Sequence, residues 1–184
     1  MEFRDFRLWS DAEEADNVTL EGNPWRRRRP AMFAEWFWRK QMGKVYEAFE
    51  SMDAERLARL WAEDAVLEFP AGTPMAGPWR GRAEIEAILR AIFAHNASIS
   101  VTPHRVAVYH PWSPTGSMTV FAAWTFNEVG RDGHTYRGDV VSRSEIRHWK
   151  TVHTRDCFSN VPGNAEHYAT MEVPPRRAPA EHVR

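Results

Sequence analysis

The chain has 184 residues, a formal net charge of −1 at pH 7 and one cysteine, Cys157. This length fits one domain that can bury roughly 70% of its unfolded surface, and the near-neutral charge argues against nucleic acid as a partner. One cysteine excludes an intramolecular disulfide and favours a reducing, cytoplasmic location, while no apolar run reaches the ~18 residues of a membrane span, so no membrane partner is expected.

Residues 1–30 are predicted to form an extension outside the core. Four consecutive arginines, 26–29, end this segment, and short charge runs of this kind are usually solvated. Trp9 and Trp25 indicate that the extension packs on another surface, either a second subunit or the domain itself.

Apolar residues at helical spacing predict three helices in the N-terminal half, over residues 31–51, 54–62 and 83–95. Asp53 is expected to be the N-cap of the second helix, because its side chain can accept hydrogen bonds from the first turn. Between the second and third helices we expect a short strand over residues 65–69 and then a loop rich in Pro and Gly.

Alternating patterns after residue 97 predict an antiparallel sheet. The expected strands cover residues 98–110, 118–129, 134–147 and 151–158, and the Asp-Gly turn at 130–133 is a typical hairpin signal. The chain becomes polar and Pro-rich after Asn160, as a C-terminal tail would.

Three motifs of the chain, at residues 61–70, 77–89 and 154–159, resemble those of the nuclear transport factor 2-like superfamily and its SnoaL-like members. Residues 154–159, TRDCFS, are similar to the closing strand W-R-[DE]-Y-F-D of that superfamily. WAEDAVLEFP at 61–70 is similar to [FW]-A-[ED]-D-A-x-[VL]-x-x-P, and GPWRGRAEIEAIL at 77–89 to a G-x-x-[AE]-I helix start. The resemblance covers about residues 42–160.

The resemblance implies an α+β fold in which a curved antiparallel sheet, wrapped by three N-terminal helices, forms a cone with a mostly apolar cavity. Members of the superfamily are commonly homodimers that pack through the outer faces of their sheets. We therefore expect an N-terminal extension at 1–30, a cone domain at 31–160 and a C-terminal tail at 161–184. No cofactor and no metal site are expected.

Asp156 is the first candidate for a catalytic group. It occupies the acidic position of the closing strand, which in the related epoxide hydrolases is a base that points into the pocket. Burial in an apolar cavity would raise the pKa of Asp156 and suit it to acid/base work near neutral pH. Tyr46 lies near the position of an oxyanion-binding tyrosine in ketosteroid isomerases and is the second candidate, as a donor to a carbonyl. The side chains expected to bind substrate are Phe49, Trp61, Leu67, Phe69, Phe93, Thr125, Val140, Thr154 and Phe158.

Several alternatives stay open at this stage. Asp139, His153 or a pair formed by Asp53 and His95 could carry the chemistry in place of Asp156. Phe69 stands where ketosteroid isomerases have their base, so the resemblance does not specify that reaction. The leading hypothesis is a cofactor-independent cyclase, isomerase, dehydratase or epoxide hydrolase acting on a small apolar molecule. The competing hypothesis is a non-catalytic module that binds a small ligand or dimerises.

Overall fold

One sheet and four helices form the part of the chain that the computed structural model describes, residues 28–110 and 117–176. The helices and strands in chain order are α1 (Arg28–Glu50), α2 (Ala54–Ala58), β1 (Trp61–Phe69), β2 (Gly77–Arg80), α3 (Arg82–His95), β3 (Asn96–Tyr109), β4 (Met118–Gly130), β5 (Thr135–Arg147), β6 (Lys150–Phe158) and α4 (Val161–His167).

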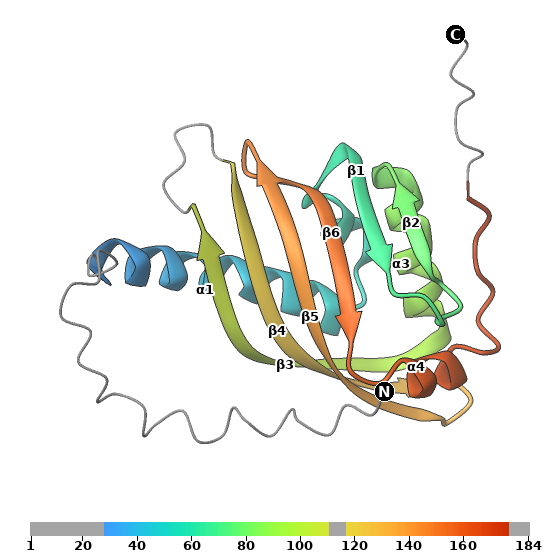
Figure 1. Ribbon diagram of the computed structural model, residues 1–184. Coiled ribbons are helices and arrows are strands. Elements are labelled where there is room, and N and C mark those ends of the chain that lie inside the picture. Colours follow the sequence, from blue (N-terminus) through green and yellow to red (C-terminus); the bar gives the residue numbers. More distant parts are fainter. Residues whose placement is uncertain (1–27, 111–116, 177–184) are drawn as a thin grey trace, which may run out of the picture.

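The strands form a curved, open sheet in the order β2-β1-β6-β5-β4-β3. All neighbouring strands are antiparallel except β1 and β6, which are parallel. Figure 1 shows α1, α2 and α3 behind the sheet, with α1 crossing β3 and α3 beside β1 and β2. The predicted fold class, a curved sheet with three helices on one face, is confirmed.

The buried stripe of α3 explains why this segment is a helix and how it packs. Its inward side chains follow the spacing i, i+3, i+4, i+7, i+8. They are Ile85, Ile88, Leu89, Ile92 and Phe93, each at most 6% exposed. Asp53 caps α2 as predicted, since its carboxylate accepts a hydrogen bond from the backbone nitrogen of Arg56 at 2.9 Å.

Two boundaries near β1 differ from the sequence prediction. The second helix ends at Ala58 and not at 62, and Trp61 is the first residue of β1. Burial at Ala65, Leu67 and Phe69 has the period of two that a strand requires. The segment 77–80, expected to be loop, is the short strand β2, which buries Trp79 completely and lets its indole donate to the carbonyl of Met75 at 2.9 Å.

The residues after Asn160 begin with a helix and pack on the domain, although their composition is typical of a tail. The Asn160 side chain caps α4 by accepting a hydrogen bond from the Gly163 nitrogen at 2.9 Å. Tyr168, just after α4, is only 2% exposed. Further on, the Arg176 guanidinium lies 4.5 Å from the centre of the Trp79 ring. This segment therefore contributes to the core.

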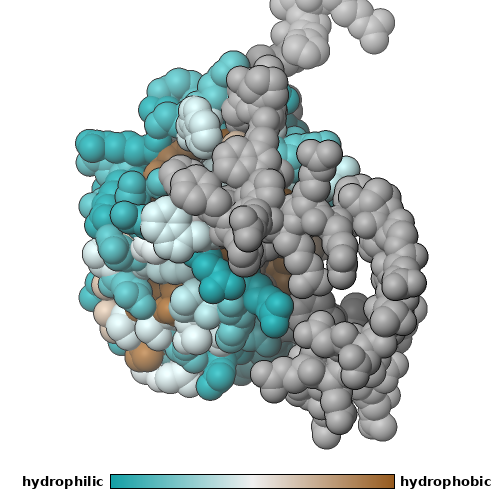
Figure 2. All heavy atoms as spheres, turned by 90° about the vertical axis from the view of Figure 1, so that its left-hand side faces the viewer, coloured by the Kyte–Doolittle hydropathy of each residue, from teal (hydrophilic) through white to brown (hydrophobic). Residues whose placement is uncertain are grey.

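Seen from the α1 end of the molecule, the described surface is mostly hydrophilic and shows hydrophobic residues only in small areas (Figure 2). No helix within the described ranges is long and apolar enough to cross a membrane. The predicted packing of Trp9 and Trp25 concerns residues outside the described part of the chain.

Candidate functional site

A cavity of about 410 Å³ lies between the inner face of the sheet and the helices. Its wall is mostly apolar and comes mainly from α1, β1, β4, β5 and β6. Seven of the nine side chains that the sequence suggests for substrate binding line it, namely Phe49, Trp61, Leu67, Phe69, Val140, Thr154 and Phe158.

Phe93 and Thr125 are not part of this wall. Phe93 belongs to the core and contacts the Phe49 ring at 5.9 Å. Thr125 has the opposite parity from the inward-facing residues of β4 and therefore points to the outer face of the sheet. There its hydroxyl donates to Asp139 and lies 2.7 Å from His104 Nε2.

A β-bulge sets which side chain meets Asp156. Ile146 pairs with Thr151, but Glu145 pairs with His153, so Val152 is an extra residue in β6. The bulge shifts the register by one residue and reverses the faces of β6 beyond it. Asp156 consequently lies opposite Ser142, on the cavity side, together with Thr154.

Asp156 is a half-buried residue whose carboxyl group has Ser142 as its hydrogen-bond donor. The Ser142 hydroxyl donates to Asp156 Oδ1. Burial raises the pKa of Asp156 from 3.8 to about 6, and the hydrogen bond from Ser142 opposes part of this increase. Next to this pair, the hydroxyls of Ser144 and Thr154 are 3.0 Å apart. Asp156 can thus accept or donate a proton near neutral pH.

Tyr46 is not one of the residues that line the cavity. Its ring meets the edge of Trp124, which does line it, at 5.9 Å between ring centres. The Tyr46 hydroxyl is buried without a hydrogen-bond partner among the described residues. Burial also raises the pKa of Tyr46 to about 12.

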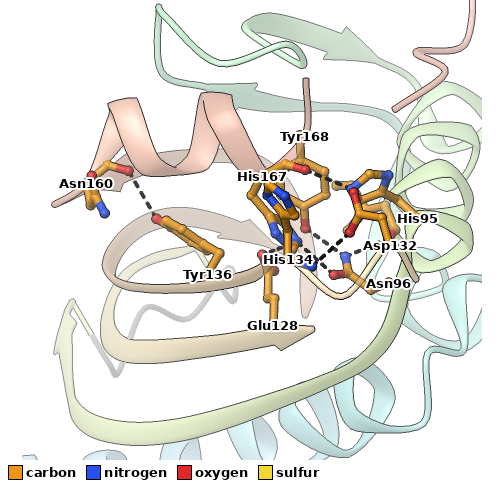
Figure 3. A network of polar contacts seen from close by, with 10 residues as sticks. His95, Asn96, Glu128, Asp132, His134, Tyr136, Asn160, His167 and Tyr168 are labelled. Atoms are coloured by element: carbon orange, nitrogen blue, oxygen red, sulfur yellow. Dashed lines mark hydrogen bonds and ion pairs between the residues drawn. The ribbon is translucent and has the colours of Figure 1, made fainter. Parts of the chain in front are cut away.

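A second polar group lies at the other end of the cavity, where the turn between β4 and β5 meets α4 (Figure 3). We call it the closed end and define it as Glu128, Tyr136, Asn164 and Tyr168, each at most 6% exposed. Burial raises the pKa of Glu128 to about 7, although a hydrogen bond from the Tyr168 hydroxyl works against this. The cavity wall therefore contains two carboxyl groups, the half-buried Asp156 and the buried Glu128.

The family model of the SnoaL-like domain matches residues 42–154 of this sequence. The chain belongs to the SnoaL-like family. No curated protein sequence matches this SnoaL-like protein at a significant level.

Three solved structures show how widely the fold of this SnoaL-like protein occurs. A proposed aromatic ring hydroxylase from Novosphingobium aromaticivorans is 20% identical with a TM-score of 0.59, covering 70% of this chain and 90% of its own. A proposed isomerase from Bacillus subtilis is 24% identical with a TM-score of 0.55, covering 72% and 94%. An NTF2-like protein with a cystatin-like fold, also from N. aromaticivorans, is 18% identical with a TM-score of 0.54, covering 76% and 91%. At these identities the likeness shows the fold alone.

The alternative candidates of this SnoaL-like protein lie away from the cavity wall. Asp53 caps α2, and His95 Nε2 is 2.8 Å from the carbonyl oxygen of His167. Asp139 is exposed, and His153 Nε2 lies 3.4 Å from a carboxylate oxygen of Glu68. Within the described ranges no three His, Cys, Asp or Glu side chains are grouped so that they could hold a metal ion.

Sequence reasoning missed Ser142 and the closed end. Ser142 lies on the inward parity of β5 beside Val140, so strand alternation could have indicated it. The same rule places Glu128 on the cavity side of β4, in line with Trp124 and Phe126. Tyr168 follows a segment whose composition predicts a tail, and no pattern in the sequence marks it as buried.

Proposed function

We propose that this SnoaL-like protein is a cofactor-independent enzyme that binds a small, largely apolar molecule in the cavity and uses Asp156 as its acid or base. The observation that carries this proposal is a carboxyl group that lines a mostly apolar cavity, where desolvation raises the pKa of Asp156 to about 6. A pKa close to the working pH lets one group both take up and release a proton. Cyclisation, isomerisation, dehydration and epoxide opening all require such a transfer.

In this proposal Ser142 positions Asp156 and the apolar wall positions the substrate. The hydrogen bond from Ser142 engages Oδ1 and leaves Oδ2 for the substrate. The adjacent Ser144 and Thr154 hydroxyls provide a further polar contact for a substrate oxygen. Tyr46 has no direct part, because it is not one of the lining residues.

A panel of small cyclic ketones and epoxides tests the proposal across two classes of reaction. In D₂O, deuterium enters the carbon next to a carbonyl when a base abstracts its proton, and in H₂¹⁸O the heavy oxygen enters a diol when an epoxide opens. We expect activity on at least one class, reduced on the order of 10²-fold or more in Asp156→Asn. Asp64→Asn, the same change at an exposed carboxylate of β1, is the matched control.

The competing proposal is a ligand-binding module without catalysis. It is favoured by the wall of the cavity, which apart from two carboxyl groups and a few hydroxyl and amide groups is apolar. This second function would be supported if compounds bind to the wild-type protein but the wild type converts them no faster than Asp156→Asn does. They would rule out Asp156 as the catalytic group for those compounds.

A further inference from the structure

The cavity has one exposed end and one buried end. Trp149 lines the first and is 65% exposed, whereas the four residues of the closed end are at most 6% exposed. Along β5 the order of the cavity-lining residues is Ile146, Ser144, Ser142, Val140 and Tyr136. Ser142, and with it Asp156, therefore lies between the exposed end and the closed end.

The closed end contains acceptors that lack donors. Glu128 Oε2 and Asn164 Oδ1 are both buried and have no hydrogen-bond partner among the described residues. A buried acceptor without a partner costs free energy, so native proteins rarely leave one unsatisfied without a reason. Here two of them come from residues that line one end of a ligand-sized cavity.

The donors of Asn96 and His167, close to these acceptors, are engaged with other groups. The Asn96 amide nitrogen donates to the Ile92 carbonyl at 2.9 Å and to the Tyr168 hydroxyl at 3.0 Å. This orientation leaves Asn96 Oδ1 as the acceptor for His167 Nε2 at 2.9 Å. The same His167 nitrogen is 3.8 Å from Glu128 Oε2, which is too far for a hydrogen bond.

We infer that the closed end binds the hydrogen-bond-donor end, a hydroxyl or an N–H group, of an otherwise apolar ligand. The inference rests on the proposed function only in that the cavity binds such a molecule. A donor group satisfies Glu128 Oε2 or Asn164 Oδ1. A ligand carboxylate would meet the like charge of Glu128, and an apolar end would leave both acceptors unpaired in a dry environment.

The closed end also depends on the C-terminal segment and on a glycine of β5. Asn164 and Tyr168 follow residue 154, where the match to the SnoaL-like domain ends. Tyr136 reaches the cavity because residue 138 is glycine: a Cβ there would lie 2.0 Å from the Tyr136 hydroxyl oxygen. The donor preference is therefore built by the C-terminal segment as well as by the common fold.

Three probes of similar size test the inference: 2-naphthylmethanol, 2-ethylnaphthalene and 2-acetylnaphthalene. The alcohol can donate a hydrogen bond. The ethyl compound can neither donate nor accept one, and the ketone can only accept one. Their affinities are measured by calorimetry or fluorescence at pH 8. For each protein we take the affinity for the alcohol divided by the affinity for the ethyl compound. The informative quantity is this ratio in wild type divided by the same ratio in Glu128→Leu, because the free energy of transferring each probe from water is the same for both proteins and cancels.

We expect this quotient to be about ten or more, the size of a hydrogen bond to a charged acceptor. The ketone should gain nothing from Glu128. The matched control is Glu166→Leu, which removes an exposed carboxylate of α4 and should leave the ratio unchanged. In wild type, nuclear Overhauser contacts should join the CH₂ of the alcohol to the rings of Tyr136 or Tyr168, and this measurement does not depend on a variant that folds.

Equal ratios in wild type and Glu128→Leu, or an alcohol group that points toward Trp149, would overturn the inference. The proposed function would then stand, because its test concerns Asp156 and turnover. If none of the three probes binds to wild-type protein, both the inference and the binding premise of the proposed function fail.

Discussion

Replacing Asp156 with asparagine should stabilise this protein at pH 8, because it removes the charge and can keep the hydrogen bond with Ser142. The carboxyl must be ionised at that pH inside an apolar wall, and burial raises the pKa of Asp156 from its ordinary 3.8 to about 6. At about 1.4 kcal/mol per pKa unit, ionisation of the folded protein costs about 3 kcal/mol as an upper limit. Asparagine keeps an acceptor oxygen for Ser142 and carries no charge.

The sign of the pH dependence follows from proton binding. Because the pKa of Asp156 is higher in the folded than in the unfolded state, the folded protein binds more protons between about pH 4 and 6. The free energy of unfolding therefore decreases as the pH rises through this window and becomes level above it. Glu128 adds a similar decrease from about pH 4.5 to 7, since burial raises its pKa to about 7.

Urea unfolding at half-unit steps from pH 4 to pH 8 measures both effects. In Asp156→Asn the decrease between pH 4 and 6 should become smaller, while the part contributed by Glu128 remains. Asp64→Asn, at an exposed position of β1, should follow the wild-type curve. Identical pH profiles for wild type and Asp156→Asn would show that the carboxyl is hydrated in the folded state, and the reasoning from burial would be refuted.

Three further outcomes test the packing and the assembly. Gly138→Ala should lower the free energy of unfolding by about 1–3 kcal/mol in urea, because the new methyl group overlaps the Tyr136 hydroxyl. Arg176→Ala should cost about 0.5–1 kcal/mol in the same assay through loss of its contact with the Trp79 ring. Sedimentation should show a homodimer through the outer face of the sheet, where Phe121 is 41% exposed, and Phe121→Asp should give monomers. A wild-type monomer at high micromolar concentration would contradict this.

The sequence predicts the elements whose periodicity is strong and long. The stripe of α3 and the alternation of β4 and β5 carry enough repeats to specify both type and face. The prediction fails at residues 59–62 because Leu60 and Trp61 suit a helix stripe and a strand equally well. Pairing of Trp61 with Thr151 of β6 decides in favour of the strand, and this is a long-range contact that no local pattern contains.

In the candidate site, too, the sequence predicts one part and not the other. A motif is sufficient to single out Asp156, but its partner depends on register. The turn at His148 and Trp149, both with positive φ, pairs Arg147 with Lys150. Continued without interruption, that register would place Val141 opposite Asp156. The bulge at residue 152 replaces it with Ser142, and the sequence of β6 carries no signal for the bulge.

Desolvation of the two carboxyl groups lowers the stability of the fold at pH 8, and a function of the cavity explains why both are present. Either could be replaced by a neutral side chain of similar size with a gain in stability at pH 8, since neither Asp156 nor Glu128 forms a hydrogen-bonded ion pair. Their environments differ: Asp156 is bound by one hydroxyl midway along the cavity, whereas Glu128 belongs to a network with a tyrosine at the closed end. Two carboxyl groups in different surroundings of one cavity can take separate roles. Asp156 as the group that transfers a proton, and Glu128 as the acceptor for a ligand donor, are the two roles that account for both positions.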